Sequence, residues 1–155
     1  MNTQSEKVVQ DGDIVVRELG ALWVHGVSIR PAAPLGFGRI GERLHFLLPG
    51  NPVAAWVGFR YFVRPGLRLL SGMTPEQAFK PERTARALLA RKIASVAGRT
   101  DFVRVRFTAN GRLEPIGSGG AGMLTTVTKA DGVVLVPGPL EGLEEGTEVE
   151  VELLD

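Results

Sequence analysis

The segment Leu47-Leu48-Pro49-Gly50-Asn51-Pro52 constrains this chain most, because it joins a strand end, a tight turn and a helix start. The apolar residues 43–48 predict a buried strand, and the prolyl-glycine pair predicts a turn. Asn51 is a favourable N-cap, and Pro52 suits the first helical position, where a missing N–H costs nothing. Backbone N–H groups at the positive end of a helix dipole attract oxyanions such as phosphate. We expect either an anion-binding site at Pro49, Gly50, Asn51 and Pro52 or a capped strand-to-helix connection that binds no ligand.

Charge is distributed unevenly along the chain, although the formal net charge is +1. Arginine dominates residues 21–72, whereas residues 131–155 are acidic and contain neither lysine nor arginine. Arginine suits bidentate recognition of phosphate or carboxylate. Arg30 and Arg39 lie in a Pro/Gly-rich loop, so we place both in the candidate anion site. A further set shares one helix side and is expected to form a solvent-exposed stripe: Arg60, Arg64 and Arg68.

Composition limits the class of protein. A chain of 155 residues with 44% hydrophobic residues can bury roughly two-thirds of its unfolded surface. Because cysteine is absent, neither disulfides nor thiolate metal sites are expected, and the reducing cytoplasm is the expected location. No apolar run approaches the roughly 18 residues that cross a bilayer, and the polar start does not look like a signal peptide. The charge balance argues against nucleic acid as a partner.

A composition break near Ser71–Pro75 predicts two domains, residues 1–74 and 75–155. The first reads as a helix closed by Gly20, a strand over 21–29, an irregular loop over 30–38, the strand 43–48, and a helix from Pro52 to about Leu70, kinked at Pro65. This alternation predicts an α/β layer with parallel strands covered by helices. Two strands cannot complete such a layer, so we expect a missing N-terminal segment or another subunit to complete it.

The second part reads as β-structure. Alternating runs over 84–96 and 102–107 lead to an Asn110-Gly111 hairpin turn, and strands are expected over 112–116, 133–136 and 147–153. A glycine-rich loop over 117–122 opens a short helical segment over 123–130. The closing strand is apolar on one face and acidic on the other. We expect a small β-barrel-like domain.

Several motifs, in order along the chain, carry a family resemblance: His25–Pro31, Gly36–Arg39, Leu48–Val53, Phe62–Pro65, Leu69–Gly72, Gly98–Arg99, Phe102–Val105, Gly122–Leu124 and Glu141–Val151. Residues from about 11 to 155 resemble the C-terminal part of the molybdopterin molybdotransferases, which are the bacterial molybdenum-insertion enzymes and the E domain of gephyrin.

The resemblance implies the C-terminal half of a three-layer α/β molybdopterin-binding domain followed by a β-barrel-like domain. It implies insertion of molybdate into adenylylated molybdopterin, with release of AMP, in a homodimer that uses a divalent metal such as Mg²⁺. Pro49 and Pro52 match active-site prolines, and Arg30 takes the place of a basic residue that could bind molybdate or phosphate. Arg104 matches an arginine that faces the cleft from across the dimer. Replacing Arg30 by Ala is expected to weaken ligand binding with little loss of stability.

Departures from the family pattern affect the expected activity. Pro31-Ala32-Ala33-Pro34 stands where many relatives have Pro-Gly-Lys-Pro, and Gly119-Gly120-Ala121 stands where they have Gln-Gly-Ser. The family's metal-binding carboxylates lie upstream, and Glu42 is the single acid in this half of the cleft. We therefore expect a C-terminal fragment or truncated homologue that is inactive alone. A non-catalytic pterin-binding or scaffold module and a relative of the pterin adenylyltransferases stay as alternatives.

The remaining candidates are expected to be structural. His25 and His45 lie in apolar strands with no third ligand at metal-binding spacing, so no metal site is expected in this chain. Asp101, beside Gly98-Arg99, is interpreted as a turn residue. The aromatic side chains are expected in the core rather than in a pterin-stacking platform: Trp23, Trp56, Phe59 and Phe62.

Overall fold

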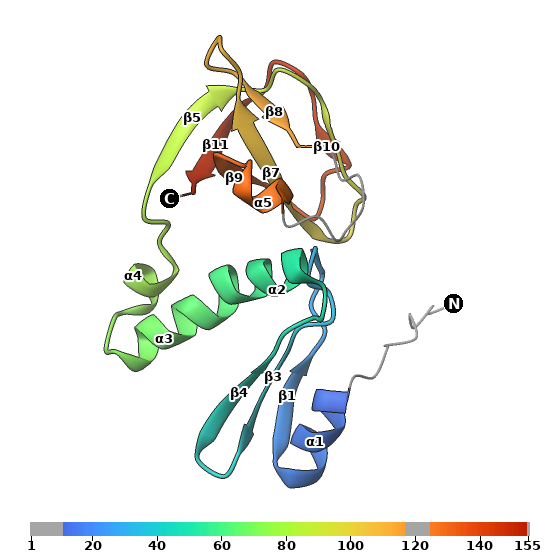
Figure 1. Ribbon diagram of the computed structural model, residues 1–155, viewed down its shortest axis with the longest axis vertical. Coiled ribbons are helices and arrows are strands. Elements are labelled where there is room, and N and C mark those ends of the chain that lie inside the picture. The colour runs from blue at the N-terminus through green and yellow to red at the C-terminus, as the bar shows by residue number, and fades with distance from the viewer. Residues whose placement is uncertain (1–10, 117–124, 155) are drawn as a thin grey trace.

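The computed structural model describes residues 11–116 and 125–154, and begins with a helix and a three-stranded sheet (Figure 1). Helix α1 (Asp11–Leu19) precedes the strands β1 (Ala21–His25), β3 (Gly36–Ile40) and β4 (Arg43–Leu47), which lie in the order β1-β3-β4. Both pairings are antiparallel, so the expected purely parallel arrangement is wrong. The prediction of an irregular loop over 30–38 is also wrong for its last residues, because β3 begins at Gly36. The two-residue turn at Gly41-Glu42 is too short for a crossover and therefore forces β3 and β4 into a hairpin.

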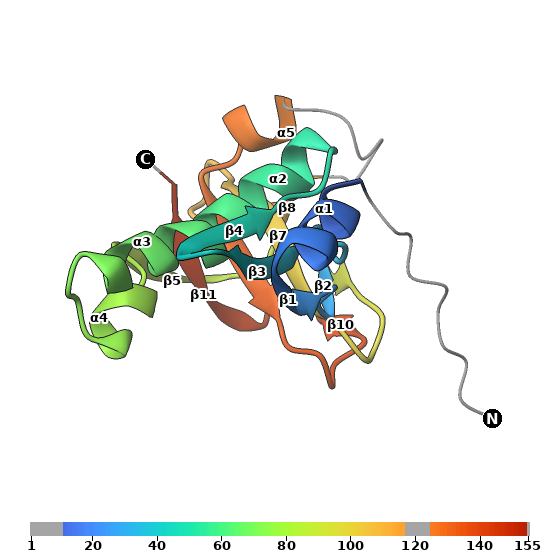
Figure 2. The same cartoon turned by 90° about the horizontal axis from the view of Figure 1, so that it is seen from below.

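Helices cover both faces of this sheet, which gives three layers (Figure 2). On one face, a Cβ added to Gly38 would lie 2.7 Å from Cγ1 of Val16 in α1. On the other face, a Cβ added to Gly66 would lie 2.8 Å from the Phe46 ring. Glycine at these two positions therefore lets the helices pack closely on the sheet.

The long helix that follows the turn has three consecutive parts: α2 (Pro52–Gly58), the π-helical segment η1 (Phe59–Val63) and α3 (Arg64–Leu70). The N–H of Arg64 reaches back to the carbonyl of Phe59, five residues earlier. Pro65 has no N–H, so the expected disturbance of the helix coincides with a widened turn directly before the proline. Helix α4 (Pro75–Phe79) then starts at Thr74 with a capping box formed with Gln77.

The rest of the chain forms a larger sheet. Its strands lie in the order β2-β7-β9-β11-β5, with β8 paired to β7, and β6 pairs separately with β10. The bounds are β2 (Ile29–Arg30), β5 (Thr84–Leu88), β6 (Ile93–Ala94), β7 (Thr100–Phe107), β8 (Leu113–Pro115), α5 (Thr125–Thr128), β9 (Gly132–Val136), β10 (Gly142–Leu143) and β11 (Glu148–Leu153). The predicted hairpin at Asn110-Gly111 is confirmed by the β7–β8 pairing. The glycine-rich loop over 117–122 lies outside the described residues.

This sheet does not close into a barrel. One isolated bridge, between Leu89 and Leu113, connects its two ends within the described part of the chain. One face of the sheet packs on a buried cluster contributed by its own strands and loops: Leu89, Ile93, Val105, Leu113, Val134, Val136, Val149 and Val151. The β structure is therefore confirmed, in the form of an open sheet with its own core.

A second buried cluster joins the two parts of the molecule. Ile29 and Ala32 pack with Ala54 and Val57 of α2, and with Phe102 and Val133 of the larger sheet. The predicted strand over 21–29 is interrupted at Gly26, whose φ of 85° ends β1, and the chain continues as β2 in the other sheet. Strand β2 runs parallel to β7, and it thereby brings residues from the start of the sequence to the edge of the C-terminal sheet.

Candidate functional site

The capped turn before α2 is formed as the sequence predicts. Oδ1 of Asn51 accepts hydrogen bonds from the N–H groups of Val53 at 3.0 Å and Ala54 at 3.3 Å. These two N–H groups are therefore satisfied by the cap itself. Among the described residues, nothing lies within 4 Å of a Cβ added to Gly50. An anion-binding site at Pro49–Pro52 stays a prediction.

Arg30 lies where β2 pairs with β7. Its Cα is in register with that of Asp101, and its Nη2 donates a hydrogen bond to Oδ2 of this carboxylate. The Arg30 side chain is 46% exposed, whereas that of Asp101 is 1% exposed. The interpretation of Asp101 as a turn residue is therefore wrong, because it is a buried strand residue that anchors a half-exposed arginine. The neighbouring residue Ile29 belongs to the buried cluster that includes Ala54 and Val57 of α2, and strand alternation places the Arg30 side chain on the opposite face of β2.

Arg104 occupies the same strand three residues beyond Asp101. Side chains alternate between the faces of a strand, so Arg104 and Asp101 lie on opposite faces of β7. Arg104 is half-buried, and this burial lowers the pKa of its guanidinium. Its Nε is buried and has no hydrogen-bond partner among the described residues. Within one chain, the structure does not bring Arg104 to the face that carries Arg30.

Arg39 is not brought to the turn either. It is in register with Leu44 of β4, three residues before the strand end at Leu47. At about 3.3 Å per residue, this separation is roughly 10 Å along the strand. The Arg39 guanidinium instead lies 6.0 Å from the centroid of the Trp23 ring, a cation–π distance.

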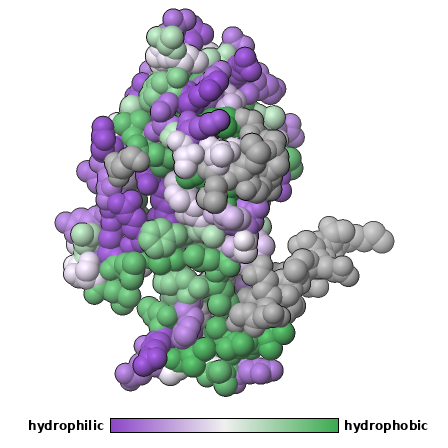
Figure 3. Space-filling view, viewed as in Figure 1, coloured by the Kyte–Doolittle hydropathy of each residue, from purple (hydrophilic) through white to green (hydrophobic). Residues whose placement is uncertain are grey.

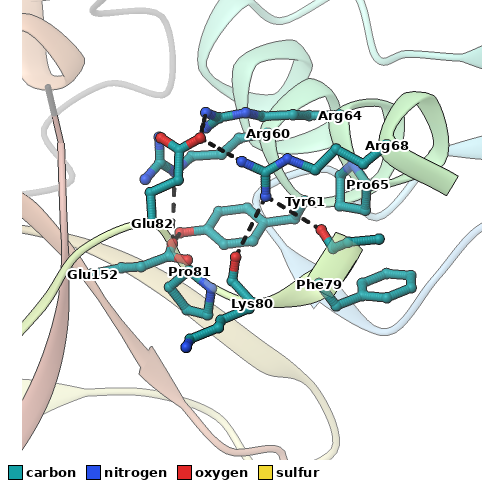
Figure 4. Close-up of a pocket in the computed structure, with 11 residues that line it drawn as sticks. Arg60, Tyr61, Arg64, Pro65, Arg68, Phe79, Lys80, Pro81, Glu82 and Glu152 are labelled. Carbon is teal, nitrogen blue, oxygen red and sulfur yellow. Dashed lines mark hydrogen bonds and ion pairs between the residues drawn. The ribbon is translucent and has the colours of Figure 1, made fainter. Parts of the chain in front are cut away.

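The arginines on the long helix are not the exposed stripe that their spacing predicts. The exposed fractions of the side chains are 14% for Arg60, 32% for Arg64 and 20% for Arg68. They line a small cavity of about 50 Å³ between the helix and the segment that follows α4 (Figure 4). The prediction failed because these side chains meet acids from other parts of the sequence.

Two carboxylates neutralise this cluster. Glu82 accepts hydrogen bonds from Arg64 and Arg68, and the bond from Arg64 is the main cause that lowers the pKa of Glu82. Glu152 accepts a hydrogen bond from the Tyr61 hydroxyl and lies 3.6 Å from Nε of Arg60. Burial, together with Glu152, raises the pKa of Tyr61. Glu152 from the acidic end of the sequence, together with Glu82, therefore partly neutralises the three arginines.

The described residues do not fit a Mg²⁺ site. No group of three or more histidine or carboxylate side chains within the described ranges could hold a metal ion. Glu42 lies in the β3–β4 turn, at the end of β4 away from Pro49. Asp101 is buried and paired with Arg30.

The aromatic side chains divide into two groups. Trp56 and Phe62 pack against the cluster that joins the two sheets, as expected for core residues. Trp23 is 53% exposed and Phe59 is 48% exposed, so the expectation that they lie in the core is wrong for these two residues.

Among the helices of the described part, none has the length and apolar character needed to span a membrane.

Two protein families match consecutive parts of the chain. Residues 13–69 match the probable molybdopterin binding domain, and residues 86–154 match the MoeA C-terminal region, domain IV. The chain is 42% identical over 150 residues to a protein of Methanocaldococcus jannaschii named for molybdopterin biosynthesis, covering 94% of this chain and 34% of that protein. It is 35% identical to molybdopterin molybdenumtransferase 1 of Mycobacterium tuberculosis, covering 90% of this chain and 34% of the relative.

Solved structures agree with these matches. A molybdopterin biosynthesis MoeA protein of Pyrococcus horikoshii superposes with a TM-score of 0.70 at 35% identity, covering 90% of this chain and 34% of that one. A molybdenum cofactor biosynthesis protein of Pyrococcus furiosus gives a TM-score of 0.72 at 33% identity, covering 87% and 46%. The chain spans about a third of the length of the curated relatives that it matches. In sequence and in fold, this chain matches the C-terminal part of the molybdopterin molybdotransferases.

Proposed function

We propose that this chain acts in molybdenum cofactor biosynthesis as the pterin-binding C-terminal part of a molybdopterin molybdotransferase. The proposed reaction inserts molybdate into adenylylated molybdopterin and releases AMP. The observation that carries the proposal is Arg30, whose half-exposed guanidinium is held by the buried carboxylate of Asp101. A fixed, half-exposed guanidinium suits the recognition of a phosphate or molybdate oxyanion.

The remaining catalytic groups are proposed to come from elsewhere. Hard oxygen ligands are needed to bind Mg²⁺, and the described residues do not offer such a group. We therefore assign the metal ligands to a further N-terminal segment or chain, which would also complete the three-stranded sheet. A homodimer is part of the proposal, because Arg104 faces away from Arg30 within one chain and would need a second copy to reach that site.

The two alternatives differ in how well the observations support them. The match of residues 86–154 to a MoeA C-terminal region disfavours an adenylyltransferase, whose likeness is expected in the α/β part alone. A binding or scaffold module without chemistry is favoured by Ala33, which stands at a position where relatives carry a lysine. Binding measurements on the chain and activity measurements on the completed enzyme separate this module from a catalytic part.

The test is isothermal titration of the purified chain with adenylylated molybdopterin, with and without molybdate and Mg²⁺. Wild-type protein is compared with Arg30→Gln, which keeps a polar group opposite Asp101, and with Arg112→Gln as a control in the exposed β7–β8 turn. We expect Arg30→Gln to weaken binding roughly tenfold or more, because a charge-assisted bond is lost. The control should bind as the wild type does.

Activity is tested by adding the missing part. An N-terminal segment from a relative, supplied as a separate chain or as a fusion, should yield AMP and molybdenum cofactor when molybdate and Mg²⁺ are present. Binding without any AMP release in this reconstituted system would favour the scaffold module. Absence of binding by the folded wild-type chain would contradict the pterin-binding role.

A further inference from the structure

Arg99 lies beside the pair formed by Arg30 and Asp101. It immediately precedes β7, and its Nε is 3.6 Å from Oδ1 of Asp101. Nη2 of Arg30 donates to the other oxygen, Oδ2, which also accepts a hydrogen bond from Ser95 Oγ at 2.6 Å. A single carboxylate therefore has one guanidinium at each of its oxygens.

The three side chains differ strongly in exposure. Asp101 is 1% exposed, whereas Arg30 is 46% exposed and Arg99 is 38% exposed. The Nε of Arg99 and the Oδ1 of Asp101 are both buried and have no hydrogen-bond partner among the described residues, so Arg99 is held by charge, at 3.6 Å, rather than by a hydrogen bond. Each guanidinium has five N–H donors and directs one nitrogen towards the carboxylate. The exposed remainder of both groups can therefore donate outward, and the cluster of two cations and one anion keeps a charge of +1.

We propose that Arg30 and Arg99 form a two-arginine clamp for a tetrahedral oxyanion, and that Asp101 is the positioning residue that holds both guanidinium groups. This inference rests on the proposed function, because it adds a second binding residue to the Arg30 site and assigns the ligand chemistry. Molybdate and the phosphate of the pterin share this chemistry, since both present several oxygens to planar guanidinium forks.

The positioning role has a distinctive electrostatic consequence. Asp101 is negative, so its charge alone opposes the binding of an anion nearby. If charge decided the outcome, neutralising Asp101 would strengthen anion binding. If Asp101 acts by fixing the arginines in place, neutralisation releases them, and the ordering cost of binding rises. The direction of the change in affinity therefore separates the two effects.

The experiment titrates the full chain with molybdate, with inorganic phosphate and with adenylylated molybdopterin. Affinity is measured by calorimetry, and the Nε–Hε signals of Arg30 and Arg99 are followed by ¹⁵N NMR. We expect both signals to shift on binding, and we expect Arg99→Gln to weaken binding roughly tenfold. Arg112→Gln is the matched control. A response to molybdate alone would identify the molybdate site, and a response to phosphate and the pterin alone would identify the pterin phosphate site.

The outcomes separate this inference from the proposed function. Weaker binding in Arg30→Gln, with wild-type binding in Arg99→Gln, would overturn the clamp and leave the role of Arg30 intact. No binding of any of the three anions by folded wild-type chain would overturn both.

Asp101→Asn should weaken binding despite the loss of a negative charge, and stronger binding would overturn its positioning role. If this variant does not fold, Ser95→Ala decides the point, since it keeps the carboxylate and removes one of its tethers. Weaker binding with broadened Arg30 and Arg99 signals is then expected, and unchanged affinity with unchanged signals would overturn the role.

Discussion

The first region, residues 11–74, and the second region, residues 75–116 with 125–154, bury their apolar side chains to different extents. The second region has a core of eight buried side chains, and Leu89, Val105 and Leu113 in it are fully buried. Both regions expose some large apolar side chains, but the first exposes more of them, and hydrophobic residues predominate over it on the face seen in Figure 3. The exposed large apolar side chains of the first region are Ile14, Val15, Leu19, Trp23, Leu44, Phe59, Leu67, Leu69, Leu70 and Met73, and those of the second are Phe79, Leu88, Val96, Phe107, Leu135 and Leu140. The contrast shows that the larger sheet buries its own apolar face, whereas the first region leaves apolar side chains exposed, mainly on its helices.

The contrast is tested most strongly by truncating one leucine in each region. Leu113→Ala removes a fully buried side chain from the core of the second region and should lower the free energy of unfolding by about 2–5 kcal/mol. Leu70→Ala removes a side chain that is 67% exposed and should change it by less than about 0.5 kcal/mol. Urea unfolding measures both values. Equal losses at the two positions would contradict the contrast.

The junction between the regions is tested by Arg30→Ala. This change leaves the Asp101 carboxylate buried with the more distant Arg99, at 3.6 Å, as its remaining cationic neighbour. Loss of a partner from a buried pair costs about 3–5 kcal/mol, and the 46% exposure of Arg30 reduces our expectation to about 2 kcal/mol. The structure therefore replaces the sequence-based expectation of little loss of stability. Thermal and urea unfolding check it, and an unchanged midpoint would show that the pair does not hold β2 to β7.

The capped turn at Asn51 should contribute less to the free energy of unfolding than the Arg30–Asp101 pair does. Asn51→Ala removes the acceptor of the bonds from Val53 and Ala54 and should cost about 1 kcal/mol. Asn51→Asp keeps a capping oxygen and serves as the control. If the two variants unfold at the same urea concentration, the cap does not stabilise the first region.

The smallest effect is expected at Glu82. Hydrogen bonding to Arg64 lowers the pKa of Glu82 below its usual value of 4.5. Ionised Glu82 therefore stabilises the folded protein fully above pH 4.5, and this stabilisation is lost as the pH falls through the lowered pKa. Glu82→Gln should therefore lower the melting temperature slightly at pH 7 and leave it near that of the wild type in strong acid. Glu145→Gln, at an exposed site, is the control. A difference that grows on acidification would contradict the assigned sign.

Structural features that depend on residues close together in the sequence could be predicted from the sequence. The cap at Asn51, the hairpin at Asn110-Gly111 and the two-faced strand β11 each depend on residues within a few positions, and all three are confirmed. The strand β3 was missed because prolines and glycines dominate residues 31–38, which is a composition typical of loops. Gly38 is needed in this strand because α1 packs closely against it.

The partners of the arginines could not be read from local sequence. Arg30 and Asp101 are 71 positions apart, and Tyr61 and Glu152 are 91 positions apart. Helical spacing placed Arg60, Arg64 and Arg68 on one face correctly, but spacing does not say what that face meets. Resemblance to a family supplied the residues around Arg30, whereas the buried carboxylate behind it became visible only in three dimensions.

The pairing of β2 with β7 has a consequence for dividing the protein. A cut at the composition break near residues 71–75 would separate the peptide chain without separating the two structures, because the first piece supplies an edge strand to the second. A C-terminal piece expressed alone would present the open edge of β7 and a buried carboxylate without its arginine. The two pieces are therefore suited to fragment complementation, in which each recovers its native structure by binding the other.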